Sequence, residues 1–272
     1  MTSNRKWTGP RAGLATMAKA IGVGFLAVSF AAHPAFSADV AAVPVTTELE
    51  RALAAGSQRV NFGKESASAQ ARHVADWVLD SGDNRGMPFM LVDKTDAKVF
   101  VFHADGRMHG AAPALLGLAV GDDSVPGIGQ RKLASILPDE RTTPAGRFVA
   151  ALDRNLHGGQ ILWVDYDSSI SLHPVITSNV KERRAQRLAT PTPLDNRVSY
   201  GCINVPAEFF KNVVSAAFTG TNGVVYVLPE TRSAQQVFAS YDVDERAQLR
   251  AAAQQDVAAP ADVQSNAKLA GQ

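Results

Sequence analysis

Short apolar runs separated by polar or turn-forming residues dominate the middle of the chain. Runs of this length predict β-strands, and their close spacing favours a mainly antiparallel sandwich or barrel-like sheet over repeated strand–helix–strand units. The expected strands lie at 89–92, 99–102, near 108, and at 115–120, 148–152, 161–166, 170–172 and 224–228, with a hairpin tip at His157-Gly158-Gly159.

Helical periodicity flanks this β-rich region on both sides. Apolar residues recur at helical spacing between Ser66 and Gly82, which predicts a helix capped by the serine and ended by the glycine. A second helix is predicted at 206–218, where a proline opens an apolar face of phenylalanine and valine residues. A third is predicted at 244–253, and the residues around it read as a solvated tail. The fold class is therefore mainly β with flanking helices (α+β).

The N-terminal residues have the pattern of an export signal. Four basic residues precede an apolar stretch at 20–32, small residues follow at 35–38, and no acidic residue occurs before Asp39. An uncleaved membrane anchor is the alternative for the same residues. The chain divides into a signal peptide at 1–38, a helical extension at 39–87, a β-rich domain at 88–229 and an Ala/Gln-rich polar tail at 230–272.

Composition and charge narrow the classes of function. The 272 residues are 46% hydrophobic, enough to bury a sizeable core. Formal charge is +1, and loss of residues 1–38 leaves 23 basic against 26 acidic residues, a net charge of −3. A mildly acidic chain gives no support for nucleic-acid binding. We therefore expect an exported protein of the periplasm or cell envelope, with no stable membrane span after signal removal.

The single cysteine is the feature of the sequence that points most specifically to a chemical reaction. One cysteine excludes an internal disulfide and a Cys-cluster zinc site. Cys202 lies in Ser199-Tyr200-Gly201-Cys202-Ile203-Asn204, where Gly201 permits a sharp turn. Consecutive backbone N–H groups at such a turn can point at one developing negative charge. A small buried hydrophobic side chain is the ordinary alternative for a lone cysteine.

A cysteine nucleophile needs a base, and the chain has six histidines. His173 ends the strand predicted at 170–172, where its side chain can enter a cleft. The others lie in the signal, a helix or turns, where no chemistry is needed to explain them: His33, His73, His103, His109 and His157. A histidine at a strand end also commonly has a structural role.

Three segments in this order resemble the L,D-transpeptidase (YkuD-type) catalytic domain. They are Thr143-Pro144-Ala145-Gly146-Arg147-Phe148, Leu172-His173 and the Ser199–Asn204 motif, and the resemblance covers residues 88–229. It implies that fold, peptidoglycan stem peptides as substrate, and acyl transfer from the third residue of a tetrapeptide stem to an amine acceptor through a cysteine thioester. No metal or organic cofactor is implied.

The resemblance also implies roles for individual residues. Cys202 corresponds to the nucleophile and His173 to the general base, oriented by the carbonyl of Pro174. The backbone N–H groups around Tyr200, Gly201 and Cys202 correspond to the oxyanion donors, with Ser199 and Asn204 as motif positions.

Two features depart from the family pattern. Tyr200 stands where the family has a histidine. Additional residues at 179–193 separate His173 from the cysteine motif, either as a solvated surface excursion or as a lid whose arginines meet substrate carboxylates. Arg197, close to the nucleophile in sequence, either grips a substrate carboxylate or forms a structural salt bridge.

Other functions remain open at this point. The same fold can use water as acceptor, which gives an L,D-carboxypeptidase, and a catalytically silent cell-wall scaffold is a further alternative. A papain-like protease is disfavoured, because its Cys-Gly-Ser-Cys signature is missing and the histidine precedes the cysteine. The sequence does not determine the oligomeric state.

Overall fold

The computed structural model describes residues 59–258. The predicted signal peptide at 1–38 lies outside this range. So do residues 39–58 of the predicted extension and residues 259–272 of the predicted tail.

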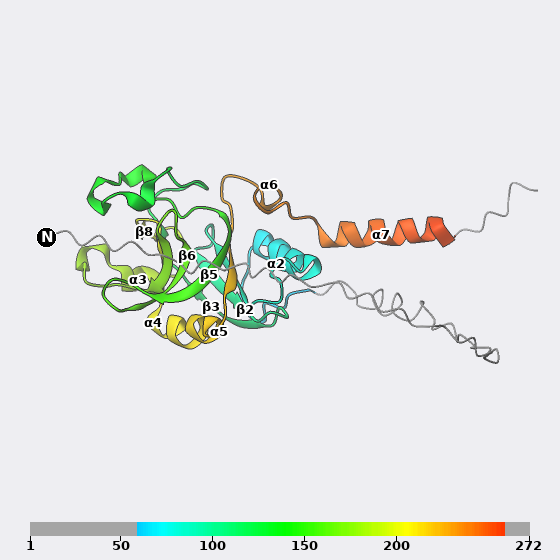
Figure 1. Cartoon of the computed structure of the whole chain (residues 1–272), viewed down its shortest axis with the longest axis horizontal. Coiled ribbons are helices and arrows are strands. Elements are labelled where there is room, and N and C mark those ends of the chain that lie inside the picture. The colour runs from blue at the N-terminus through cyan, green and yellow to red at the C-terminus, as the bar shows by residue number, and fades with distance from the viewer. Residues whose placement is uncertain (1–58, 259–272) are drawn as a thin grey trace, which may run out of the picture. The chain divides into compact units, whose positions relative to one another are not determined.

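An eight-stranded mixed sheet forms the centre of the described part of the chain (Figure 1). Its neighbours are antiparallel except for the pairs β1–β10 and β7–β9, which are parallel. In spatial order the strands are β3 (Met108–Pro113), β2 (Lys98–Phe102), β1 (Phe89–Asp93), β10 (Gly223–Val227), β5 (Gly146–Arg154), β6 (Gln160–Asp165), β7 (Ile170–Pro174) and β9 (Ile203–Val205).

The two edges of this sheet are joined by the chain that follows β3. Leu115 and Asn204 exchange both backbone hydrogen bonds, at 2.8 and 2.9 Å, which links this segment to β9. Immediately afterwards β4 (Leu116–Gly117) pairs in parallel with β8 (Arg197–Ser199). The predicted mainly β architecture with a barrel-like sheet and flanking helices is confirmed. The 115–120 run, however, contributes only the two residues of β4.

Both faces of the central strands are buried, in two separate cores. On β1, Met90 and Val92 join an inner core with β6, β7 and β9, whereas Phe89 and Leu91 face a second core. Alternate residues of a strand point to opposite faces, so a strand covered on both sides is continuously apolar. All five residues of β1 and of β10 are buried accordingly.

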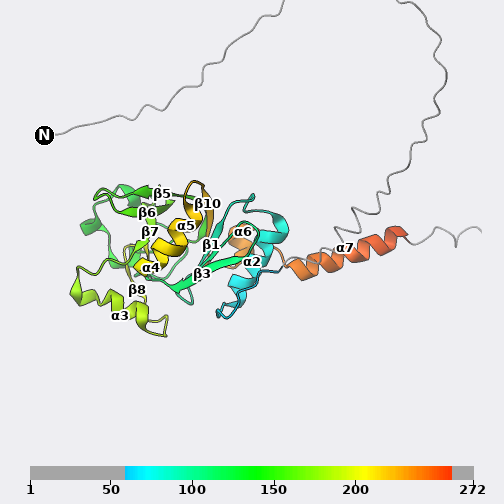
Figure 2. The ribbon, with the colours of Figure 1, turned by 90° about the horizontal axis from the view of Figure 1, so that it is seen from below.

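Helices pack on both sides of the sheet (Figure 2): the helical segment at 207–218 covers the inner core, and the N-terminal helix covers the second core. The predicted N-terminal helix is α2 (Ala69–Ser81), and its cap is Ser68 rather than Ser66, since the Ser68 hydroxyl accepts the Ala71 N–H at 3.0 Å. Gly82 ends it in a left-handed conformation, as predicted. The predicted helix at 206–218 is α4 (Ala207–Phe209), a π-helical turn (Phe210–Val214) and α5 (Ser215–Phe218), with Pro206 just before its first residue.

The tail forms α6 (Ala234–Phe238) and α7 (Val243–Ala258), of which only the second was predicted. Among the helices within residues 59–258, none combines the length and apolarity needed to cross a bilayer.

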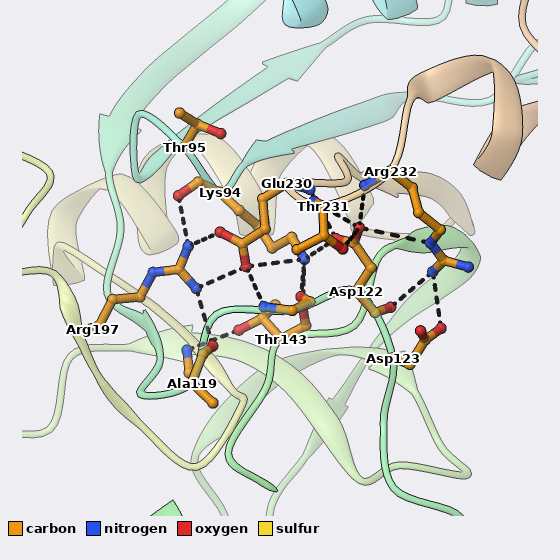
Figure 3. A network of polar contacts seen from close by, with 12 residues as sticks. Lys94, Thr95, Ala119, Asp122, Asp123, Thr143, Arg197, Glu230, Thr231 and Arg232 are labelled. Carbon is orange, nitrogen blue, oxygen red and sulfur yellow. Dashed lines mark hydrogen bonds and ion pairs between the residues drawn. The ribbon is translucent and has the colours of Figure 1, made fainter. Parts of the chain in front are cut away.

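A buried polar network joins distant parts of the chain near the end of β10 (Figure 3). The fully buried ammonium of Lys94 donates to Asp122 at 2.8 Å and to the carbonyls of Gly121 and Thr143 at 2.5 and 3.0 Å. The Asp122 carboxylate also accepts backbone N–H groups from the segment after β10, at 2.8 to 2.9 Å, from Glu230, Thr231 and Arg232.

These contacts decide the charge state of Asp122. Burial works to raise the pKa of its carboxyl group, but the Lys94 ammonium and the donors of the 230–232 segment outweigh burial and lower the pKa well below its ordinary value. A group with a lowered folded-state pKa stabilises the fold above its unfolded pKa, and that contribution is lost as the pH falls.

We predict that Asp122→Asn lowers the free energy of unfolding by about 1.5–3 kcal/mol near neutral pH, because the buried Lys94 ammonium loses the nearer of its two carboxylate partners and retains Glu230 at 3.5 Å. The wild-type protein should lose stability as the pH falls below about 4, and the variant should show a shallower acid dependence. Urea unfolding measured across pH 2–7 tests both effects; equal stability of the two proteins would contradict them. Asp123→Asn is the matched control, since that carboxylate is exposed and pairs with Arg232 at the surface.

Candidate active site

The cysteine lies in a tight turn between β8 and β9 that only glycine can complete. Gly201 has φ +127°, and a Cβ there would lie 2.7 Å from both the Thr142 carbonyl oxygen and Ile170 Cδ1. The buried Ser199 hydroxyl donates to the Cys202 carbonyl at 2.6 Å and accepts the Gly201 N–H at 3.0 Å. The Gly201 N–H is thereby engaged, so the predicted oxyanion donors narrow to Tyr200 and Cys202.

Asn204 ties this turn to the segment at 179–193. Its side-chain amide donates to the Cys202 carbonyl at 3.2 Å, and its Oδ1 accepts from the Arg184 guanidinium at 2.8 Å. Arg184 begins α3 (Arg184–Ala189) and pairs with Glu182 at 2.5 Å. The additional segment therefore packs against the cysteine turn through one arginine, while Arg183 and Gln186 remain exposed.

Strand pairing brings His173 and Cys202 together. β7 and β9 are parallel neighbours, and His173 lies opposite Asn204 in the register. The imidazole and the thiol are close enough for each to shift the pKa of the other. His173 Nδ1 lies 2.8 Å from the Pro174 carbonyl oxygen, which can only accept, so Nδ1 carries the proton and Nε2 is the basic nitrogen.

The two groups shift each other's pKa in opposite directions. Burial works to raise the pKa of the Cys202 thiol, but its hydrogen bond with His173 and the charge of that ring outweigh burial and lower the pKa. Burial works to lower the pKa of His173, and the contact with Cys202 and the Pro174 carbonyl reverse this, so the pKa is raised despite the charge of Arg184. The pair is therefore biased toward thiolate and imidazolium.

Two serines near the sulfur were not identified from the sequence. Ser171 Oγ and the Ser169 carbonyl oxygen each lie 3.7 Å from Cys202 Sγ. The Ser171 backbone and hydroxyl both help to lower the pKa of the thiol. The sequence did contain a signal for Ser171. It precedes His173 by two residues, and two-residue spacing places both side chains on one face of a strand.

The thiol is half-buried and opens into a small cavity of about 70 Å³. The wall opposite the cysteine comes from the segment at 122–142, which contains three short 3-10 helices at Ile128–Gln130, Leu133–Ser135 and Pro138–Glu140. This wall supplies apolar side chains together with Arg131, while residues 168–170, Tyr200 and Cys202 complete the lining. The sulfur is thus reachable, as covalent chemistry requires.

Tyr200 is held in place by a cation from the same wall. The guanidinium of Arg141 lies 3.9 Å from the centre of the Tyr200 ring, a distance at which a cation–π contact is favourable. Arg141 also donates to the Ile136 carbonyl at 3.1 Å. Tyr200 therefore presents a fixed aromatic face beside the cysteine.

Arg197 lies in the buried network rather than in the cavity lining. Its guanidinium pairs with Glu230 and donates to the Lys94 carbonyl at 3.1 Å. Of the two roles that its sequence position left open, the salt bridge is the one that the structure contains. Within residues 59–258, no cluster of three or more His, Cys, Asp or Glu side chains is arranged to hold a metal ion.

A larger cavity of about 360 Å³ lies against the 179–193 segment. Its lining includes the exposed Arg183 and Gln186 as well as Arg184, which reaches the cysteine turn through Asn204. Arg184 therefore both lines this cavity and hydrogen-bonds to Asn204 beside the cysteine turn.

Comparison with solved structures finds matches at low identity. The helical cell shape determining protein Pgp2 from Campylobacter jejuni is 17% identical, over 63% of this chain and 58% of that chain, with a TM-score of 0.38. L,D-transpeptidase 3 from Mycobacterium tuberculosis is 15% identical, over 52% of this chain and 60% of that chain, with a TM-score of 0.34. This chain spans 58–60% of the length of those two proteins. No protein-family model and no curated protein matches the sequence.

Proposed function

We propose that this chain is an L,D-transpeptidase that acts on peptidoglycan stem peptides. The observation that carries the proposal is the parallel register that places His173 beside the Cys202 turn, with its Nδ1 fixed on the Pro174 carbonyl and the pKa of the thiol lowered by the imidazole. The three ordered motifs that resemble the family support it, as does the opening of the sulfur into a cavity.

In the proposed reaction, His173 Nε2 takes the thiol proton and the Cys202 thiolate attacks the carbonyl of the third stem residue. The backbone N–H groups of Tyr200 and Cys202 stabilise the oxyanion, and the imidazolium protonates the leaving D-Ala amine. The resulting thioester conserves the energy of the amide, so an acceptor amine can complete the transfer without a nucleotide. His173 then takes the proton of the attacking amine, and the thiol is restored on collapse of the second adduct.

The proposal places the protein outside the cytosol. Residues 1–38 would direct export, and the mature chain would meet its substrate in the periplasm or cell envelope. An L,D-carboxypeptidase that uses water as the acceptor is the second candidate. It is favoured by the small volume beside the sulfur, which admits water more easily than a second stem.

The first experiment incubates the protein without residues 1–38 with a disaccharide tetrapeptide and follows the products by mass spectrometry. We expect loss of D-Ala, a thioester adduct on Cys202 and a cross-linked dimer. Cys202→Ala should abolish all three, because no other thiol is present. Free tripeptide without dimer would identify the carboxypeptidase, and binding without any adduct would favour the silent scaffold.

The second experiment measures the rate of Cys202 alkylation by iodoacetamide as a function of pH. We expect the midpoint to lie below the ordinary range of a thiol, because His173 favours the thiolate. His173→Gln should move the midpoint upward and lower kcat by roughly 10²–10⁴-fold. His157→Gln, at an exposed hairpin tip, is the control. An unchanged midpoint in His173→Gln would remove histidine as the base.

The third experiment addresses the 179–193 segment. If its exposed arginine meets a substrate carboxylate, Arg183→Ala should raise KM several-fold and leave kcat within about twofold, since the contact is made equally in the ground and transition states. Arg154→Ala is the matched control, because that arginine lies in the exposed β5–β6 hairpin. Equal KM values for the wild type, Arg183→Ala and Arg154→Ala would indicate that Arg183 does not contact the substrate and that the segment is a solvated surface loop.

A further inference from the structure

One ammonium group holds both ends of the segment that walls the Cys202 cavity (Figure 3). Lys94 Nζ donates to the carbonyl of Gly121, just before this segment, and to the carbonyl of Thr143, just after it. The 3-10 helices at 128–130 and 133–135, which help to line the cavity, lie between these two points. The Lys94 side chain has no exposed surface, so its position is fixed by these contacts and by Asp122.

A single side chain then links this anchor to the cysteine turn. The buried Thr143 hydroxyl donates to the Gly201 carbonyl at 2.8 Å and accepts the Gly117 N–H at 2.9 Å. The Gly201 carbonyl and the Cys202 N–H belong to one planar peptide group and point in opposite directions. Fixing the carbonyl therefore fixes the direction of the N–H, which is one of the two remaining oxyanion donors.

A second branch of the network holds the strand that enters the turn. Glu230 accepts the Gly121 N–H at 2.9 Å and pairs with Arg197 on β8. The Arg197 guanidinium also donates to the Lys94 carbonyl. The wall segment and β8 are thus tied to the same small group of buried charges, which has little freedom to move because unpaired charges there are costly.

We propose that Lys94 and Thr143 are positioning residues for the Cys202 thiol. Lys94 sets the two ends of the wall segment, and Thr143 transmits that position to the Gly201–Cys202 peptide group. Their effect on catalysis rests on the proposed function, but their effect on the thiol itself does not.

The decisive comparison uses three threonine variants. Thr143→Val removes the hydroxyl with little change in volume, Thr143→Ser keeps it, and Thr231→Val removes a hydroxyl from the same network on the side away from the cysteine turn, where it donates to Asp122. Alkylation of Cys202 reports on one site, because the chain has one cysteine. Thermal unfolding identifies the temperature range in which each variant is folded.

We expect the midpoint of the alkylation pH profile of Thr143→Val to lie about one unit above that of the wild type, so that alkylation is about tenfold slower at pH values below the wild-type midpoint. Thr143→Ser and Thr231→Val should follow the wild-type profile, even if Thr231→Val unfolds at a lower temperature. With stem substrate, Thr143→Val should lower kcat at least tenfold with KM within about twofold. A wild-type alkylation profile in folded Thr143→Val, or an equal change in Thr231→Val, would overturn the proposal.

The role of Lys94 is tested by hydrogen exchange. Lys94→Met should accelerate exchange in residues 122–142 at least tenfold relative to β1 and β10, whereas Lys98→Met, which removes a partly exposed ion pair with Glu65, should not. Unchanged exchange in a folded Lys94→Met variant would refute the anchoring role, and if that variant does not fold, the threonine series decides.

If the wild-type protein transfers no acyl group but the threonine series behaves as expected, the proposed function fails and the positioning of the thiol stands. If transfer occurs and the series shows no difference, the positioning inference fails alone.

Discussion

The candidate site depends on the parallel pairing of β7 with β9. That pairing sets His173 opposite Asn204 and brings the imidazole within reach of Cys202, two residues that are far apart in the sequence. Parallel strands cannot be joined by a tight hairpin, so this register exists only once the chain between them has been routed elsewhere. Here the intervening residues form α3, whose Arg184 returns to contact Asn204. The additional segment therefore packs on the pair that it separates in sequence.

At the candidate site, the electrostatic contacts lower the pKa of the Cys202 thiol, whereas burial works to raise it. A half-buried thiolate is unfavourable by itself, and it is stabilised by the imidazolium and by the Ser171 backbone and hydroxyl. The fixed Nδ1 hydrogen bond to Pro174 leaves only Nε2 to exchange a proton with sulfur. Pro174 orients the ring although it has no polar side chain, because its backbone carbonyl accepts the Nδ1 proton.

A second set of charges, around Lys94, lies behind the site and has a different character. These groups are paired with several partners each, and the pKa of Asp122 is lowered rather than poised near neutrality. A network of this kind can hold backbone segments in fixed positions, but its groups are not poised to exchange protons near neutral pH. It connects the segment after β10 with the wall of the cavity and with β8, and so couples the C-terminal part of the fold to the cysteine turn.

The sequence by itself determined the longer strands, the presence of the N-terminal helix and its end at Gly82, and the glycine turn before Cys202, and it singled out His173 among six histidines, because each has a local pattern of periodicity or turn chemistry. Their catalytic roles stay predictions. Only the tertiary structure decided that Arg197 pairs with Glu230, that Arg184 reaches Asn204 and that Lys94 is buried, since a charged residue carries no local sign of its distant partner. The tertiary structure also decided that β8 and β9 form, because three-residue strands are too short to show a pattern of alternating apolar residues. Their pairing is fixed by the closing sheet, through contacts between residues that no local pattern connects.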